Sequence, residues 1–498
     1  MPNYPIIVGV GQFTNRLKSL EDAIEPAEMM ARVARAAAED AGSAGLIPKI
    51  DSLQVVSILS WQYPDAPGLL AAKIGASPPQ KVYTAVGGDT PQKLVNETSE
   101  AIVKGHTRLA LLAGCEAMAS RNMARKREAQ LPWPTRGTPE SVVGDTRMGF
   151  SDVELKHGAM TPVRVYPLFE NAIRAHLSQS IDEHQQYVAE LCSRFTQVAA
   201  KNPYAWFPTA RTPDEIKTVG PDNRWIGFPY PKRMNAIMEV DQAAAVLVTG
   251  TETAKELGIP EDKWVYVHGC GQANDKWLVS DRVNYYRSPA IKAATGRALA
   301  QAGFGVDDID FFDLYSCFPS AVQMGLDALG LTPAEPRDIT VTGGLPYFGG
   351  AGNNYVMHSI ATTIERLRRN PEHKALITGL GWFATKHSAG VYSGRPPSAE
   401  WRRADPKADQ ATVDAMESPP FVAEANGPAT VETYTVIFDR AGEPEQGIVI
   451  GRLGDGSRFI ANTPAEPALL WSMTKEEFVG RQGRVQHDSD TQKNTFTP

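Results

Sequence analysis

The four-residue stretch Tyr315-Ser316-Cys317-Phe318 carries two side chains that could do chemistry. A phenol with a pKa of about 10 can donate a proton to a developing alkoxide, or accept one if a neighbour lowers its pKa. A thiol is nucleophilic only as its thiolate, and the sequence places no basic residue beside Cys317. Tyr315 is therefore a candidate to donate or accept a proton, with a side chain that merely fills space as the alternative. A buried, unreactive thiol is favoured for Cys317 over a nucleophile.

Three further side chains could serve acid–base chemistry. Tyr347 lies in the glycine-rich stretch GGLPYFGGAG (343–352). His387 follows a second glycine turn and could act as a base near neutral pH, with a solvated loop histidine as the alternative. Asp89 precedes Thr90-Pro91, a pattern that favours a helix N-cap over acid–base work.

Binding signals are weaker. Arg125 lies in a basic cluster (121–127) that could hold phosphates through charge-assisted hydrogen bonds or simply form a solvated helix face. The segment GVGQFTN (9–15) resembles part of a dinucleotide loop but lacks the third glycine and the acidic partner. The cysteines are scattered and no His/Cys/Asp cluster has metal-ligand spacing, so we expect no metal site.

Composition limits the class of protein. The 498 residues include 50 Lys+Arg and 57 Asp+Glu, a net charge of −7, and there is no basic tail, which argues against a nucleic-acid partner. No apolar run approaches the roughly 20 residues of a membrane-spanning helix, and the N-terminus does not read as a secretory signal. Four cysteines cannot cross-link so long a chain, so we expect a cytoplasmic protein.

The elements that would position these residues occur twice. An apolar strand (5–11), an amphipathic helix (25–42) and a second strand (50–58) predict a β-α-β unit, followed by a helix (91–104) and a strand ending near Gly114. ARAAAEDAGSAGLIPKIDSLQV (34–55) is similar to GRALAQAGFGVDDIDFFDL (296–314), and GHTRLALLAGCEA (105–117) to NPEHKALITGLGW (370–382), at closely similar offsets. This repetition predicts two α/β halves, each with helices covering a mostly parallel sheet.

Two segments lie outside the repeats. We expect an N-terminal half (1–118 and 235–255), an inserted loop or lid domain (119–234), a C-terminal half (256–396) and an additional domain (397–498). Alternating strands in the last segment predict a small antiparallel β-domain that could close into an OB-like barrel. Its final residues DSDTQKNTFTP (488–498) are expected to fray.

This order of halves and insertion, together with NAIMEVDQAAAVLVTG (235–250), resembles the thiolase superfamily. More narrowly, it resembles the type 1 thiolase-like proteins related to the sterol-carrier thiolases, which have an additional C-terminal domain. The resemblance implies a duplicated α-β-α-β-α layered fold, an acetyl-CoA acetyltransferase-like class and a coenzyme A thioester as substrate or ligand, without a bound cofactor.

Matched position by position, the resemblance implies that the usual catalytic side chains are missing. The acylated cysteine of the family falls at Gly88, its catalytic histidine at Gly350 and its second cysteine at Gly379, while Tyr315 stands where the family has Asn or His. Backbone N–H groups remain, so the turns at Gly88 and at 379–381 could still form an oxyanion hole. The residues expected to contact the CoA thioester are Gly88, Gly350, Gly379, Gly381 and Arg125.

Three functions stay open at this point. The leading one is an acyl-CoA-binding protein of the acyltransferase class, in lipid metabolism, that lacks the Cys/His/Cys set. The second is a retro-aldolase (lyase) acting on a β-hydroxyacyl-CoA through Tyr315, since some steroid-side-chain aldolases of the superfamily use tyrosines beside a small β-barrel partner. The third is a non-catalytic CoA-thioester or lipid carrier. The partner is expected to be small-molecule acyl-CoA, and the chain a monomer or homodimer.

Overall fold

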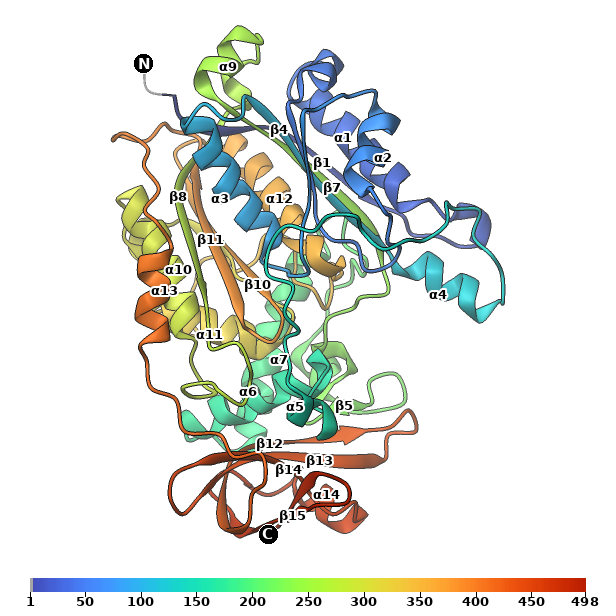
Figure 1. Ribbon diagram of the computed structural model, residues 1–498, viewed down its shortest axis with the longest axis vertical. Coiled ribbons are helices and arrows are strands. Elements are labelled where there is room, and N and C mark those ends of the chain that lie inside the picture. The colour runs from blue at the N-terminus through green and yellow to red at the C-terminus, as the bar shows by residue number, and fades with distance from the viewer. Residues whose placement is uncertain (1–2) are drawn as a thin grey trace.

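The computed structural model describes residues 3–498, and its core is one nine-stranded sheet built from both halves (Figure 1). The strand order is β3-β2-β4-β7-β1-β8-β11-β10-β9, and the halves join where β1 pairs with β8. The strands of the first half are β1 (Pro5–Thr14), β2 (Ser52–Val55), β3 (Gln80–Tyr83), β4 (Leu109–Ala117) and β7 (Asp241–Gly250). Those of the second are β8 (Val265–Asn274), β9 (Phe311–Asp313), β10 (Lys374–Gly381) and β11 (Lys386–Ser393).

Helices cover this sheet in layers, which confirms the predicted α/β class and layered duplication. Helices α3 (Thr90–Val103) and α12 (Tyr355–Arg369) form the middle layer, and each contacts strands of both halves. Helix α1 (Pro26–Asp40) covers the outer face of the first half and α10 (Pro289–Ala302) that of the second. The remaining helices of the core are α2 (Ala66–Ile74), α9 (Thr251–Glu256) and α11 (Pro319–Leu329).

Two matching glycine pairs make the duplication visible in three dimensions. GVGQ (9–12) lies in β1 and GCGQ (269–272) in β8, and each pair of glycines faces the backbone of the helix that covers its half. A Cβ on Gly11 would lie 2.2 Å from the carbonyl oxygen of Val33, and one on Gly271 would lie 1.7 Å from that of Ala294. These glycines therefore allow close helix–strand packing, and residues 9–15 do not form a dinucleotide loop.

The insertion between the halves is mainly helical. Its elements are α4 (Met118–Lys126), α5 (Asp152–Lys156), α6 (Pro162–His176), α7 (Ile181–Ala199), α8 (Pro213–Lys217), β5 (Trp225–Gly227) and β6 (Tyr230–Pro231). Between α4 and α5 the chain runs along the edge strand β3. There the N–H of Val143 donates to the carbonyl of Tyr83 (2.8 Å), and the N–H of Ala85 donates to Val143 (2.9 Å). The edge of the sheet is therefore partly covered by the protein's own chain.

The C-terminal strands close a five-stranded barrel in the order β12-β13-β14-β16-β15 and back to β12. This is the strand order of an OB-fold, so the predicted small β-domain with an OB-like barrel is confirmed. Its elements are β12 (Gly427–Phe438), β13 (Pro444–Leu453), β14 (Arg458–Asn462), α14 (Pro467–Ser472), β15 (Gln482–Asp488) and β16 (Lys493–Thr497). The approach to it contains α13 (Lys407–Asp414), which packs on α10.

The prediction that the last residues fray is wrong. Strand β16 pairs with both β14 and β15, and its Phe496 is fully buried, because the barrel closes only when this strand fills the gap. Strand β5 of the insertion pairs with β12 and joins the barrel to the rest of the molecule. Within residues 3–498, no helix combines the length and apolar composition needed to cross a bilayer.

Candidate functional site

Two of the side chains singled out in the sequence, Tyr315 and Cys317, line a largely apolar cavity of about 270 Å³. Residues from the turn between β3 and α3, the start of α6, the stretch between β9 and α11, and the end of β10 with the loop that follows form much of its wall. The rest comes from the stretches that follow β2, precede β7 and join α11 to α12. The residues of the wall are Leu59, Val86, Gly87, Gly88, Met160, Pro162, Val163, Tyr166, Ala236, Met238, Tyr315, Cys317, Phe318, Leu345, Gly350, Gly352, Asn353, Leu380, Trp382 and Phe383.

The hydroxyl of Tyr315 lies where a side chain at position 88 would begin. A Cβ on Gly88 would be 2.3 Å from Tyr315 Oη and 2.5 Å from the carbonyl oxygen of Leu380. Burial raises the pKa of Tyr315 well above its ordinary value, and the nearby Cys317 and Tyr355 raise it further. Tyr315 is therefore a neutral phenol that can donate a hydrogen bond, and it is poorly suited to accept a proton.

The turn that carries Gly88 is held from the C-terminal half. The N–H of Gly87 donates to Asn353 Oδ1 (2.9 Å), and Asn353 Nδ2 donates to the carbonyl of Ser57 (2.9 Å). In the part of the chain that the structure describes, neither the N–H of Gly88 nor the hydroxyl of Tyr315 has a hydrogen-bond acceptor. Two unused donors thus lie close together in an apolar wall. Sequence reasoning missed Asn353, although its position directly after a glycine-rich stretch was a signal.

Of the other glycines expected to contact the CoA thioester, Gly350 lies in the cavity wall and Gly379 and Gly381 do not. Gly350 is in the wall, but its N–H donates to the carbonyl of Ile237 (2.7 Å). Gly379 and Gly381 pack behind the wall, where a Cβ on Gly381 would lie 2.3 Å from Asp89 Oδ1 and one on Gly379 would lie 3.0 Å from Asp89 Cα. They permit close approach of β10 to the turn, and Leu380 between them lines the cavity.

Cys317 also lies in the wall, on the same stretch as Tyr315. Burial raises the pKa of its thiol to about 12, although the hydroxyl of Tyr166 beside it acts in the opposite direction. A thiol with this pKa is almost entirely protonated at neutral pH, so it is a poor nucleophile.

Asp89 faces a different cavity, of about 230 Å³, which it shares with Lys386. Helix α3 does begin at Thr90 as predicted, but the side chain of Asp89 makes no capping hydrogen bond. Its Oδ1 is buried without a partner among the described residues, and burial raises its pKa. Lys386 Nζ donates to the carbonyls of Val86 (2.8 Å) and Asp145 (3.1 Å).

Tyr347 does not reach the cavity beside Gly88. It lines a separate small void with Cys192, and the ring of Phe318 borders both spaces. Burial raises the pKa of Tyr347 well above its ordinary value, with Cys192 as the next cause. The phenol is therefore not placed for proton transfer at the turn that carries Gly88.

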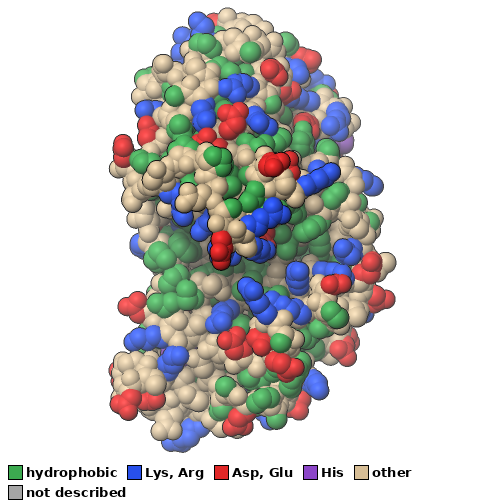
Figure 2. All heavy atoms as spheres, turned by 90° about the vertical axis from the view of Figure 1, so that its right-hand side faces the viewer, with side chains coloured by type: hydrophobic (Ala, Val, Ile, Leu, Met, Phe, Trp, Pro, Cys, Tyr) green, Lys and Arg blue, Asp and Glu red, His purple; other side chains and the backbone are tan. Residues whose placement is uncertain are grey.

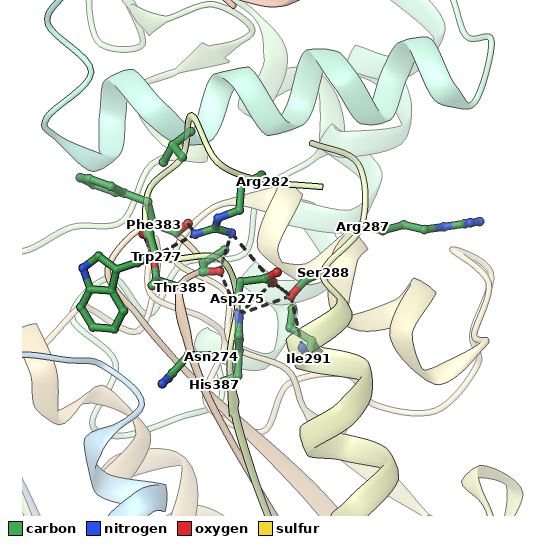
Figure 3. Close-up of polar contacts among 12 residues, drawn as sticks. Asn274, Asp275, Trp277, Arg282, Arg287, Ser288, Ile291, Phe383, Thr385 and His387 are labelled. Atoms are coloured by element: carbon green, nitrogen blue, oxygen red, sulfur yellow. Dashed lines mark hydrogen bonds and ion pairs between the residues drawn. The ribbon is translucent and has the colours of Figure 1, made fainter. Parts of the chain in front are cut away.

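His387 lies on the face of β11 opposite to its neighbour Lys386, in a buried polar cluster (Figure 3). Its Nε2 is 3.0 Å from the carbonyl oxygen of Ala384, 3.4 Å from Ser288 Oγ and 3.9 Å from Asp275 Oδ2. It is neither a solvated loop residue nor part of the cavity wall. Burial lowers its pKa to about 4.

This low pKa predicts a measurable loss of stability in acid. In the unfolded chain a histidine has a pKa of about 6.5. Between pH 6.5 and pH 4, therefore, the unfolded chain takes up a proton at His387 and the native protein does not. This difference lowers the free energy of unfolding by about 3 kcal/mol. We expect His387→Asn to reduce the difference in free energy of unfolding between pH 7 and pH 5 by about 2 kcal/mol. Urea unfolding at both pH values measures it, with the exposed His106→Asn as control. An unchanged difference would show that His387 is protonated in the native state.

Arg125 is exposed on α4 and is not one of the residues of the cavity wall. Asn122 and Lys126 of the same helix contact Glu239 (2.8 and 3.6 Å), which directly follows the wall residue Met238. Arg125 forms no ion pair with any residue that the structure describes. Figure 2 shows a hollow on this side of the molecule with hydrophobic side chains inside and Lys and Arg side chains along its edges.

Sequence reasoning missed an aromatic part of the wall. The hydroxyl of Tyr166 donates to the carbonyl of Trp382 (3.0 Å) and accepts from the N–H of Ala384 (3.1 Å), and its ring stacks on Phe318 at 4.5 Å. Trp382 and Ala384 adopt positive φ angles of 55° and 56°. The Trp-Phe pair directly after the glycine turn was the available signal.

Comparisons with known proteins agree with this architecture. Residues 409–490 match a family model described as the thiolase-like protein type 1 additional C-terminal domain, and residues 271–354 match one described as thiolase C-terminal domain-like. A 3-ketoacyl-CoA thiolase from Aliivibrio salmonicida is 28% identical over 147 residues. That match spans 28% of this chain and only 35% of the relative.

Solved structures match over more of the chain. The crystal structure of a monomeric SCP2-thiolase-like protein type 1 from Mycobacterium smegmatis is 35% identical, covers 99% of this chain and 98% of its own, and has a TM-score of 0.86. The Ltp2-ChsH2(DUF35) aldolase (17% identity, 79% of this chain, 98% of its own, TM-score 0.61) shows a shared fold only. With its sequence, its layered fold and its barrel all in agreement, this chain belongs to the thiolase superfamily, as a SCP2-thiolase-like protein of type 1.

Proposed function

We propose that the protein binds an acyl-CoA thioester in the cavity beside Gly88 without forming a covalent acyl-enzyme. Thiolase chemistry needs a thiolate nucleophile and a base that generates it. The observation that carries the proposal is the hydroxyl of Tyr315, which fills the space where the side chain of residue 88 would begin. Gly88 and Gly350 add no functional side chain to the wall, and the one thiol there, Cys317, has a pKa of about 12.

The two unused donors define where the thioester would lie. Gly88 and Tyr315 both line this apolar wall, where a hydrogen bond to a carbonyl oxygen is strong and an unpaired donor is costly. The acyl group would lie against Phe318, Leu345 and Trp382. The charged nucleotide part of CoA would remain outside, at the basic edges of the hollow, with Arg125 as a candidate phosphate ligand.

The aldolase alternative finds less support in this geometry. Retro-aldol cleavage of a β-hydroxyacyl-CoA needs a base that takes the hydroxyl proton before the carbon–carbon bond breaks. The titratable residues of the wall are Tyr166, Tyr315 and Cys317, and burial raises the pKa of all three. Binding or carriage of the thioester, with Tyr315 as a donor, therefore fits these residues better than cleavage does.

We expect Tyr315→Phe to weaken binding of acetyl-CoA about tenfold, the loss of one hydrogen bond, while binding of free CoA stays the same because it has no acyl carbonyl. Isothermal titration calorimetry with both ligands measures this. Tyr347→Phe is the matched control, since it removes a buried phenol hydroxyl outside the cavity. Equal affinities of wild type and Tyr315→Phe for acetyl-CoA would remove Tyr315 from the site.

A second experiment separates binding from chemistry. The protein is incubated with acetyl-CoA and with a β-hydroxyacyl-CoA, and the products are identified by mass spectrometry. We expect both thioesters to be recovered intact. Release of an aldehyde or ketone would identify a lyase, and transfer of the acyl group with release of free CoA would identify a transferase.

A further inference from the structure

Two buried arginines connect the C-terminal barrel to the wall of the cavity. Arg458, on β14 of the barrel, is fully buried, and its Nη1 donates to the carbonyls of Ser280 (3.1 Å) and Arg282. Its other edge is held by the Glu432 carboxylate of β12 (Nε–Oε2 2.9 Å, Nη2–Oε1 2.7 Å), and its guanidinium lies 4.7 Å from the ring of Tyr285. The barrel thus contacts the backbone of a core loop at two carbonyl acceptors, two residues apart in the chain.

The side chain of Arg282 continues this connection. Its Nη1 donates to the carbonyl of Ala384 (2.8 Å), and its Nη2 donates to the carbonyl of Phe383 and to Thr385 Oγ1 (2.9 Å each), as Figure 3 shows. The carboxylate of Asp275 lies 3.9 Å from the same guanidinium, and the N–H of Asp275 donates to the carbonyl of Thr385 (2.7 Å). One buried side chain therefore satisfies three acceptors of a single short loop.

This loop, residues 382–385, needs external support. Trp382 and Ala384 both adopt a left-handed backbone conformation that residues other than glycine rarely take. Such backbone strain persists only where contacts enforce it. Trp382 and Phe383 are wall residues of the cavity. The conformation of this part of the wall therefore depends on the hydrogen bonds that Arg282 and Tyr166 make to its backbone.

We propose that Arg458 and Arg282 are positioning residues through which the C-terminal barrel holds the 382–385 loop in its cavity-forming conformation. This assigns a function to the additional domain that does not depend on which ligand the cavity binds. Loss of the Arg458 hydrogen bonds frees the backbone at Ser280 and Arg282, and the Arg282 side chain then no longer approaches the loop from a fixed point. The loop loosens while the barrel keeps its own core.

The test compares Arg458→Lys with Arg452→Lys in the full-length protein. Both arginines pair with Glu432, but among the described residues the side chain of Arg452 otherwise donates only to the carbonyl of Gly456 (3.0 Å), within the barrel. By hydrogen–deuterium exchange and mass spectrometry, we expect peptides spanning 379–387 to exchange about tenfold faster in Arg458→Lys and at the wild-type rate in Arg452→Lys. Equal exchange of this segment in the two variants would overturn the proposal.

A spectroscopic measurement reports on the wall itself. In protein labelled with 5-fluorotryptophan, the fluorine signal of Trp382 is assigned with Trp382→Phe, and we expect it to shift or broaden in Arg458→Lys only. If Arg458→Lys does not fold, the milder Glu432→Gln takes its place. In Glu432→Gln the guanidinium of Arg458 loses its ion pair, which should increase exchange of segment 379–387 by a smaller factor than Arg282→Lys does. No increase in either variant would contradict the proposed connection.

Discussion

Replacing Gly88 by cysteine is expected to lower the free energy of unfolding by about 3 kcal/mol, because the new side chain has no space. Its Cβ would lie 2.3 Å from Tyr315 Oη and 2.5 Å from the carbonyl oxygen of Leu380. One obstacle is a side chain and the other is backbone, so the turn or β10 must move. Urea unfolding of wild type and Gly88→Cys measures the loss.

A double-mutant cycle identifies the cause. Tyr315→Ala should recover part of the loss of Gly88→Cys, and only part, because the carbonyl of Leu380 remains. Gly350→Ala is the matched control in the same wall, since its Cβ would be 3.2 Å from the nearest atom, the carbonyl oxygen of Ile237. It should cost less than about 1 kcal/mol. A Gly88→Cys protein as stable as wild type would show that the space beside Tyr315 is open.

Gly271→Ala is expected to cost more than about 3 kcal/mol or to prevent folding, because the covering helix cannot keep its distance from the sheet. The added Cβ would lie 1.7 Å from the carbonyl oxygen of Ala294. The backbone of β8 fixes the position of this Cβ, and the carbonyl belongs to the backbone of α10. No rotamer change relieves such a contact. Stability by urea unfolding, or yield of folded protein, is the readout.

The control lies on the same helix. Apart from the backbone of α10 itself, no atom of the described residues lies within 4 Å of the Cβ position of Gly296. Gly296→Ala should therefore raise the free energy of unfolding by up to about 1 kcal/mol through helix propensity alone. Gly11→Ala, the equivalent of Gly271→Ala in the first half, should destabilise as Gly271→Ala does. If Gly271→Ala were as stable as Gly296→Ala, close packing of α10 on β8 would not be a requirement of the fold.

Much of the architecture could be predicted from local patterns. The strand and helix of the first β-α-β unit end within a few residues of their predicted limits, because apolar periodicity and Pro and Gly punctuation act locally. The repeated sequence segments predicted two similar halves, and the matching glycine pairs of β1 and β8 confirm this duplication. Strand β16 could not be predicted, because its polar segment becomes a strand only when β14 and β15 provide partners.

The candidate site was less predictable, and His387 shows why. Successive residues of a strand point to opposite faces of the sheet. Lys386 consequently lines the cavity beside Asp89, whereas His387 points to Ser288 at the start of α10. Sequence alone does not establish which of two adjacent residues faces the site. Tyr347 lies in an irregular stretch, where no periodicity indicates the direction of a side chain.

The sequence by itself determined that positions 88, 350 and 379 carry no catalytic side chain, since glycine offers none in any fold. It also carried the resemblance to the thiolase superfamily, which the comparison with the protein from Mycobacterium smegmatis confirmed, because motifs and their order are properties of the chain. Only the tertiary structure decided that the hydroxyl of Tyr315 fills the space at Gly88, that His387 and Tyr347 face elsewhere, and that the barrel reaches the cavity wall through Arg458 and Arg282. These outcomes depend on contacts between residues far apart in the chain, and such contacts exist only once strand register and helix packing are set.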